Sequence, residues 1–186
     1  MTNCVFEDND YMDIMSIRVL QTLKKRFPIL LPYARKVLNL RARDNARTPM
    51  QWTGGENAGF STAKPWMKVN PNYTEINVED SEKRQDSLLN FYRKALAYRK
   101  GKEVIINGDF ALVNPKDKDV FAYSREYEGK RLLVICNYKN KRVKFKLPKN
   151  ISFSKANLAL SNYSDSLTTP KDTVLREYEA LVYELE

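Results

Sequence analysis

The chain has 186 residues, of which 42% are hydrophobic and 11% aromatic, so it is globular and fits one ordinary domain or a small domain plus part of another. It contains no histidine, which excludes Ser-His-Asp catalysis, Cys-His catalysis and any histidine-ligated metal site. The net charge of +9 permits a polyanionic partner, but 23 acidic residues are interspersed among 32 basic ones, and we therefore expect no nucleic-acid partner.

The cysteines and the N-terminal segment bear on location. Cys4 and Cys136 lie far apart and outside any CxxC spacing, which is typical of unpaired thiols in a reducing compartment. The N-terminal "MTNCVFEDND" is acidic and has no apolar run, unlike a signal peptide, and the longest apolar run, "ILL", is too short to span a bilayer. We therefore expect a cytoplasmic protein with no membrane partner.

The first helix is predicted over residues 13–26, where apolar side chains recur at helical spacing. Pro28 and Pro32 should break this helix, and "YARKVLNL" is expected to restart it. Residues 41–85 show little periodicity and many turn signals, including "TGGEN", "NPN" and "EDSEKRQD". We predict a long loop there, and loops of this length are usually functional.

A second clear helix is predicted over residues 86–100, "DSLLNFYRKALAYRK". Asp86 or Ser87 can cap its N-terminus, and Gly101 follows its last turn as a left-handed stop. Without a further layer to pack against, we expect this helix and the loop before it to expose apolar surface.

After Gly101 the pattern changes to short segments rich in β-branched and aromatic residues. In "RVKFKL", Val143 and Phe145 alternate with basic residues, which predicts one buried and one solvated face. "YEGKR" and "YKNKR" are expected to be hairpin connections. Residues 105–186 are thus predicted to form an antiparallel all-β domain of about six to eight strands, a β-sandwich by default. The predicted strands are "DFALV", "VFAYSREY", "RLLVICNY", "RVKFKLP", "ANLALSNY" and "ALVYEL".

The segment "RARDNARTPMQW" places Arg43, Asp44 and Arg47 within five residues. A guanidinium group presents several donors in one plane, which suits vicinal hydroxyls, carboxylates or phosphates. Trp52, Phe60 and Trp66 follow, and their flat faces can stack on a sugar ring. The alternative is structural: an Arg–Asp ion pair that fastens a loop over packed aromatic side chains.

The blocks "ARDNARTPMQW", "NAGFST" and "KPWMKVNPNYTEINV" closely resemble the segment after the last barrel strand in oligo-1,6-glucosidases and α-glucosidases of the α-amylase family, glycoside hydrolase family 13. The resemblance continues through "DSLLNFYRKALAYRK", which is similar to the final barrel helix, and through the β segments to "LREYEALVYEL". Only residues 18–40 depart noticeably from the family.

This resemblance implies an α+β fragment: residues 1–104 as the tail of a (β/α)8 barrel and residues 105–186 as the C-terminal β-sandwich. It also implies a truncated α-glucosidase whose parent hydrolyses terminal α-glucosidic bonds with retention. That chemistry needs two carboxyl groups about 5 Å apart. In the family these acids lie upstream of the matched segment, so we expect no catalytic residue here and no activity from the chain alone.

On the same resemblance, Arg43 is the substrate-binding residue that contacts the non-reducing glucose, and Asp44 and Arg47 are its supporting shell. Asn45 stands where many relatives have histidine. The implied partners are a glucose-containing oligosaccharide and a separately encoded barrel fragment. No cofactor is expected. No metal is expected either, because "EDND" and "NVED" lack EF-hand spacing.

Two other functions remain open. A free-standing carbohydrate-binding module would need an exposed aromatic platform on the β domain, for which Tyr123, Tyr127 and Tyr138 are candidates. A basic nucleic-acid-binding protein is suggested by the alternating lysines of the sheet, but no stacking aromatics interleave them.

Overall fold

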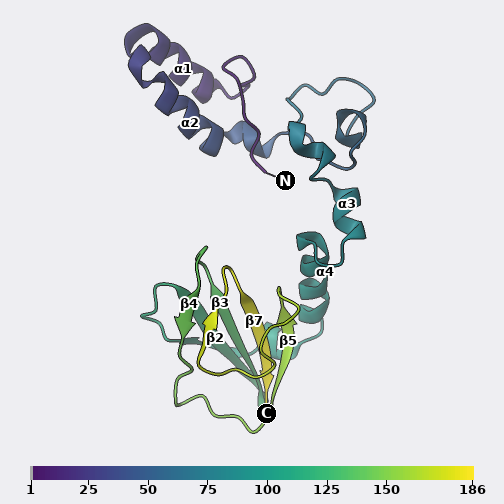
Figure 1. Cartoon of the computed structure of the whole chain (residues 1–186), viewed down its shortest axis with the longest axis vertical. Helices are drawn as coiled ribbons and strands as arrows, with labels where there is room; N and C mark the ends of the chain where they lie inside the picture. Colours follow the sequence, from purple (N-terminus) through teal and green to yellow (C-terminus); the bar gives the residue numbers. More distant parts are fainter. Residues whose placement is uncertain (1) are drawn as a thin grey trace. The chain divides into compact units, whose positions relative to one another are not determined.

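The computed structural model of the chain describes residues 2–186, and it divides into two compact units, Met1–Asn90 and Phe91–Glu186 (Figure 1). The first unit consists of helices and turns, and the second carries all the strands of the described residues.

The first unit contains the helix pair α1 (Ile14–Arg26) and α2 (Leu31–Arg41), which lie side by side (Figure 1). Asp13 caps α1 by accepting a hydrogen bond from the Ser16 backbone N–H at 3.0 Å. The predicted helix over residues 13–26 is therefore confirmed. A 3₁₀ turn, η1 (Pro28–Leu30), separates the helices. Pro32 lies in the first turn of α2, where its missing N–H removes no helical hydrogen bond.

The core of this unit joins the N-terminal segment to α1 and to the turns that follow α2. Its buried members, each at most 9% exposed, are Cys4, Phe6, Tyr11, Leu20, Ala42 and Met67. The predicted long loop after residue 41 is found as short turns: η2 (Arg43–Ala46), η3 (Glu56–Gly59) and η4 (Pro71–Thr74). The short helix α3 (Val78–Lys83) was not predicted; its N-terminus is capped by Asn77, whose side chain accepts from Asp80 N–H at 2.8 Å.

Helix α4 (Leu88–Arg99) confirms the second predicted helix. Ser87, rather than Asp86, caps it, because the Ser87 hydroxyl accepts from the Asn90 N–H at 3.2 Å. Gly101 follows with φ +74°, as a left-handed stop requires. The one-turn helix α5 (Glu103–Ile106) comes next and has no counterpart in the sequence prediction.

The second unit contains a five-stranded antiparallel sheet in the order β1-β2-β3-β7-β5 and a two-stranded sheet of β4 and β6. The mostly antiparallel sheet expected for this part of the chain is confirmed. The strands are β1 (Asp109–Val113), β2 (Val120–Tyr127), β3 (Lys130–Asn137), β4 (Val143–Phe145), β5 (Ala156–Ser161), β6 (Thr173–Leu175) and β7 (Ala180–Leu185).

One of the two predicted hairpins is present. In "YEGKR", Glu128 and Gly129 both have positive φ, of 49° and 76°, as a two-residue type I′ turn between β2 and β3 requires. The prediction for "YKNKR" is wrong, because this turn carries the chain from β3 to β4, which belong to different sheets. Both segments contain similar turn residues, but the next strand in the chain need not pair with the strand before the turn. β3 pairs with β7, which lies far away in the sequence, and not with β4.

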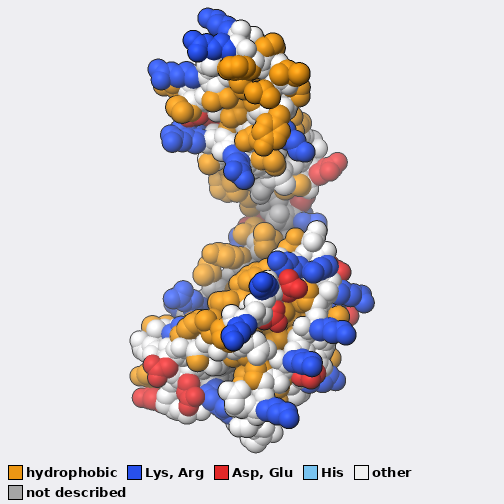
Figure 2. All heavy atoms as spheres, turned by 90° about the vertical axis from the view of Figure 1, so that its left-hand side faces the viewer, with side chains coloured by type: hydrophobic (Ala, Val, Ile, Leu, Met, Phe, Trp, Pro, Cys, Tyr) orange, Lys and Arg blue, Asp and Glu red, His pale blue; other side chains and the backbone are white. Residues whose placement is uncertain are grey.

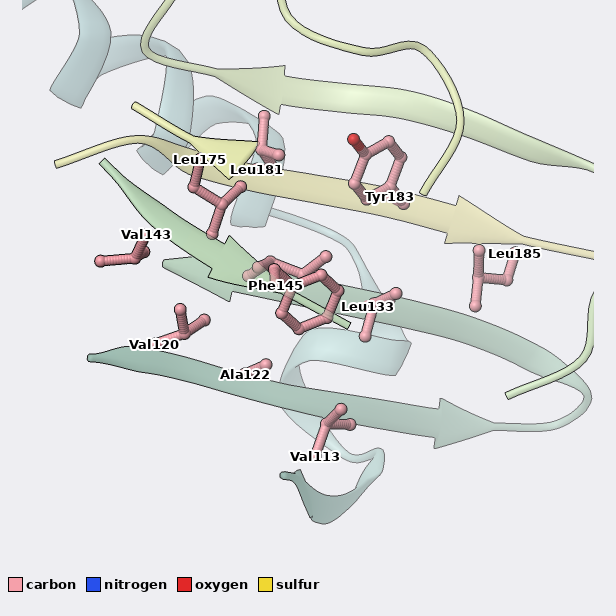
Figure 3. Close-up of a cluster of buried hydrophobic side chains, with 11 residues drawn as sticks. Val113, Val120, Ala122, Leu133, Val143, Phe145, Leu175, Leu181, Tyr183 and Leu185 are labelled. Carbon is pink, nitrogen blue, oxygen red and sulfur yellow. The ribbon is translucent and has the colours of Figure 1, made fainter. Parts of the chain in front are cut away.

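The core of the second unit lies on one face of the five-stranded sheet, which we call the inner face (Figure 3). Phe145 of β4 and Leu175 of β6, both 1% exposed, close this face from the two-stranded sheet. Val143 and Phe145 are buried while Arg142 and Lys144 are exposed, so the alternation predicted for "RVKFKL" is confirmed. The inner face itself contributes Val113, Val120, Ala122, Leu133, Ile135, Leu181, Tyr183 and Leu185.

Both units expose large apolar side chains. In the first unit Ile29 is 87% exposed and Tyr33 72%, and Figure 2 shows hydrophobic side chains gathered on this unit among Lys and Arg side chains. Along α4, Leu88 is 81% exposed, Tyr92 62% and Leu96 53%, so the exposed helix face expected from the sequence is present. None of the helices within residues 2–186 has the length and apolarity needed to cross a membrane.

Candidate functional site

Asp44 is the buried centre of the arginine-rich segment. Its side chain is 0% exposed, and its Oδ2 accepts hydrogen bonds from the backbone N–H groups of Met12 at 2.8 Å and Asp13 at 2.9 Å. Its Oδ1 pairs with the Arg47 guanidinium at 3.4 Å. Asp44 thus connects the turn before α1 to η2, although the two are more than 30 positions apart in the sequence. Arg47 is the ion-pair partner of its carboxylate.

Arg43 and Arg47 present their guanidinium groups on the surface of this turn. Both residues are exposed, and among residues 2–186 the Arg43 side chain forms no hydrogen bond or ion pair. The pKa of Asp13 lies below its ordinary value, chiefly because Ser16 N–H donates to it, and the positive charges of Arg43 and Arg47 lower it further. The planar set of donors on the Arg43 guanidinium is therefore free, and it lies near the ionised carboxylate of Asp13.

Two asparagines hold the N-terminal segment against the turn. Asn45 Oδ1 accepts from the Cys4 N–H at 2.9 Å, and its Nδ2 donates to the Asn39 carbonyl at 2.9 Å. Asn39 Oδ1 accepts from the Phe6 N–H at 2.9 Å and from the Tyr11 hydroxyl at 2.8 Å. Burial, reinforced by nearby carboxylates, raises the pKa of Tyr11 to about 12, so this hydroxyl stays a donor. Asn45 is thus a structural residue of the turn.

The aromatic residues singled out from the sequence lie on the following loop and are not buried. Trp52 is 48% exposed, Phe60 47% and Trp66 65%. Trp66 lines a hollow of about 390 Å³ between the loop at 9–12 and the loop at 57–69; Asp10 and Lys68, also in its lining, form an ion pair at 2.7 Å. Arg43 is not part of this lining, so the structure does not bring Arg43 and Trp66 into one pocket.

The carboxylates of this unit near the turn are engaged in structural contacts. Asp8 pairs with Lys24 and with Arg35, each at 2.8 Å, Asp10 pairs with Lys68, Asp13 caps α1, and Asp44 holds two backbone N–H groups. Within residues 2–186, no group of three or more His, Cys, Asp or Glu side chains is arranged to hold a metal ion. The arrangement offers forked donors and exposed aromatic faces, which are groups chemically suited to a polyhydroxyl ligand.

Several residues that shape the site were not singled out from the sequence. Asn39 and Gln51 bind partners far away in the chain and no local pattern marks them, whereas Asp13 acts locally, as the cap of α1. Gln51 is 1% exposed and donates to Asn72 Oδ1 and to the Ile76 carbonyl, both at 2.8 Å. A buried glutamine needs hydrogen-bond partners, and those of Gln51 are one side-chain oxygen and one backbone carbonyl more than 20 positions away, for which the sequence gives no signal.

Comparison with known protein families identifies the class of protein to which the chain belongs. A family model described as the α-amylase catalytic domain matches residues 32–108, and one described as the α-amylase SusG C-terminal domain matches residues 120–182. The chain belongs to the α-amylase family.

Its relatives narrow the assignment. The chain is 37% identical over its whole length to an oligo-1,6-glucosidase of Bacillus cereus and 40% identical to a probable oligo-1,6-glucosidase 2 of Bacillus subtilis strain 168. It superposes over its whole length on the crystal structure of Bacillus licheniformis trehalose-6-phosphate hydrolase with a TM-score of 0.93 and 35% identity. The chain spans about a third of these proteins: 34%, 33% and 34% of their lengths.

Proposed function

We propose that the chain is the C-terminal portion of an α-glucosidase of the oligo-1,6-glucosidase kind, whose whole enzyme hydrolyses terminal α-glucosidic bonds of oligosaccharides with retention. The observation that carries this proposal is the match of the entire chain to oligo-1,6-glucosidases at 37% and 40% identity. In this proposal residues 1–104 are the end of a (β/α)8 catalytic barrel and residues 105–186 its C-terminal β-sandwich. The two free thiols support a cytoplasmic location.

Within the whole enzyme, Arg43 is the residue of this chain that binds substrate. Its exposed guanidinium forms no ion pair among residues 2–186, so its donors are available to two adjacent sugar hydroxyls at once. Asp44 and Arg47 support it, because the buried Asp44 carboxylate fixes the turn that carries both arginines.

The catalytic acids belong to the part of the enzyme that this chain does not span. Retaining hydrolysis needs two carboxyl groups about 5 Å apart on either side of the scissile bond. The carboxylates around Arg43 are instead engaged in structural contacts. Asp13 caps α1, Asp44 accepts hydrogen bonds from backbone N–H groups, and Asp8 and Asp10 pair with basic side chains. The 186 residues alone therefore bind sugar hydroxyls at most, and hydrolysis requires the remainder of the catalytic domain.

The test replaces the matched third of the Bacillus cereus oligo-1,6-glucosidase by this chain. The chimaera should cleave an aryl α-glucoside. Arg43→Ala should lower kcat/KM roughly 10- to 100-fold, since a hydrogen bond to a charged group contributes about 1.5–3 kcal/mol. Arg41→Ala removes an exposed arginine two positions away and is the matched control. Equal kcat/KM for both variants would remove Arg43 from the substrate site.

A stand-alone carbohydrate-binding module is the second candidate, and the exposed Tyr138, 58% exposed, favours it. Tyr138 stacks on Phe121 at 5.9 Å between ring centroids, but Phe121 and Tyr123 are tilted by 52° to one another, so the rings form no continuous flat platform. Calorimetric titration of maltose and isomaltose into the free chain and into its Tyr138→Ala variant separates the two candidates: saturable binding that Tyr138→Ala abolishes would favour the module.

A further inference from the structure

The helical hairpin formed by α1, η1 and α2 carries basic residues without acidic ones. Residues 14–41 contain seven Lys or Arg residues and no Asp or Glu, whereas the whole chain has 23 acidic residues for 32 basic ones. Asp8, which precedes the hairpin, pairs with Lys24 of α1 and with Arg35 of α2, each at 2.8 Å. One carboxylate compensates only one of these positive charges, so the hairpin as a whole is strongly positive.

Large apolar side chains are exposed at the apex of the hairpin, which we define as residues 24–36. Phe27 is 54% exposed, Ile29 87%, Leu30 48% and Tyr33 72%. The buried core of this unit takes another residue of the hairpin, Leu20, which is 2% exposed. Figure 2 shows hydrophobic side chains of this unit gathered among Lys and Arg side chains. Scattered exposed apolar residues need no explanation, but four of this size within seven residues mark an interaction surface.

Basic side chains flank the apolar residues of the apex. Lys25 and Arg26 directly precede them in the sequence and Lys36 follows them; all three are exposed, and within residues 2–186 their side chains form no hydrogen bond or ion pair. The long stems of Lys and Arg lie along apolar surface while their charged ends point outward. An apolar centre with a basic margin is typical of protein surfaces that lie at the boundary between lipid headgroups and acyl chains.

Most of the apex lies outside the two family matches. The catalytic-domain model begins at residue 32 and the C-terminal-domain model at residue 120, so neither covers residues 24–31. Residues 18–40 are also the part of the sequence that departs from the resemblance to the α-amylase family. The composition of the apex is therefore not explained by membership of that family.

We propose that the apex of the α1–α2 hairpin binds the surface of an anionic phospholipid bilayer, with Ile29 and its apolar neighbours below the headgroups and the flanking basic side chains against the lipid phosphates. The positive charge selects this partner over an uncharged apolar one, because Lys and Arg side chains are attracted to an anionic leaflet. The expectation of no membrane partner is based on the lack of a spanning segment, which a surface lying on a bilayer does not need. Such binding is independent of the proposed function, because it requires no glucosidase activity.

Flotation with phospholipid vesicles tests the proposal. The full chain should float with vesicles of phosphatidylcholine and phosphatidylglycerol in equal parts. Its affinity for vesicles of phosphatidylcholine alone should be lower by about tenfold or more, because only the mixed vesicles carry net negative charge. Added salt should weaken binding to the mixed vesicles, since it screens exposed charges. A chain that stays in solution with both kinds of vesicle would overturn the proposal.

Charge variants separate binding through the apex from adsorption of a basic protein. Lys25→Gln combined with Lys36→Gln should weaken binding to the mixed vesicles roughly 20-fold, because each basic residue near the surface contributes a factor of about five. Lys118→Gln combined with Lys144→Gln is the matched control, which removes the same charge from two exposed residues of the other unit. An equal weakening by the two pairs would contradict the proposal.

Ile29→Ser tests the apolar part of the apex. This variant should bind the mixed vesicles about tenfold more weakly or less tightly still, because a large aliphatic side chain no longer leaves water on binding. Val174→Ser is the control, since Val174 is 52% exposed on β6 of the other unit. Both replaced side chains are exposed, so neither change should lower the Tm. Equal affinities of the two variants for the mixed vesicles would refute insertion of the apex.

Two outcomes would identify a different occupant of the apex. If the free chain dimerises in sedimentation and the dimer does not float with the mixed vesicles, the apex binds a second copy. If the free chain floats but the Bacillus cereus chimaera does not, the remainder of the enzyme covers the apex. Either result overturns the proposal. Flotation of the chimaera supports it whether or not the chimaera hydrolyses an α-glucoside, and a lack of hydrolysis counts against the proposed function alone.

Discussion

Replacing Asp44 tests how the turn that carries Arg43 and Arg47 is held. In Asp44→Ala, the backbone N–H groups of Met12 and Asp13 lose their shared acceptor, and Arg47 loses its partner. An unsatisfied buried donor costs about 1–3 kcal/mol, so two of them cost about 2–6 kcal/mol. The Asp44→Asn change keeps an acceptor oxygen but exchanges charged for neutral hydrogen bonds, which costs about 1 kcal/mol per bond and about 2 kcal/mol in total.

The assay is urea unfolding followed by tryptophan fluorescence. Both tryptophans, Trp52 and Trp66, lie in the unit Met1–Asn90, so the signal reports that unit alone. Asp86→Asn is the control, because Asp86 is exposed; a surface change of this kind shifts the free energy of unfolding by about 0.5 kcal/mol or less. If Asp44→Ala destabilised the unit no more than Asp86→Asn, the buried carboxylate would not be what fixes the turn.

Three other predictions each concern a single residue. Phe145→Ala should destabilise the β unit by about 3–5 kcal/mol, measured by the loss of β circular dichroism in denaturant, because Phe145 is 1% exposed between the sheets; a loss under about 1 kcal/mol would contradict this packing. Gly101→Ala should cost about 1 kcal/mol in the same assay through its φ of +74° alone, since an added Cβ would meet nothing within 4 Å; an unchanged midpoint would argue against the left-handed stop. The pKa of Asp8 is held well below its ordinary value of 3.8 by hydrogen bonds from Arg35 and Lys24, so its contribution to stability is present above pH 3.8 and is lost as the pH falls further. The tryptophan-monitored Tm should therefore decline less steeply with acid in Asp8→Asn than in the unaltered chain, and parallel curves would refute the linkage.

The elements with strong periodicity were predicted from the sequence. Residues 13–26, with apolar side chains at helical spacing, form α1, and "VFAYSREY" and "ALVYEL" form β2 and β7 over the predicted residues. The elements that were missed are short: α3, α5 and β6 have six, four and three residues, too few for a period to show. Their existence depends on a cap or on a partner strand far away in the chain.

The candidate site was predicted only in part. Arg43, Asp44 and Arg47 were recognised as a cluster, but the partners of Asp44 lie more than 30 positions away and no spacing rule connects them. The apolar character of the sheet face opposite the inner face did have a local signal. In β2, "VFAY" is apolar at four consecutive positions instead of alternating, which is typical of a strand covered on both faces.

The central claim is that these 186 residues are one part of an α-glucosidase and supply the substrate-binding turn but not the catalytic acids. The most direct measurement is glucose release from an aryl α-glucoside by the purified chain and, in parallel, by the Bacillus cereus chimaera. We expect release by the chimaera and none by the chain alone. Release of glucose by the chain itself, free of host enzymes, would contradict the claim.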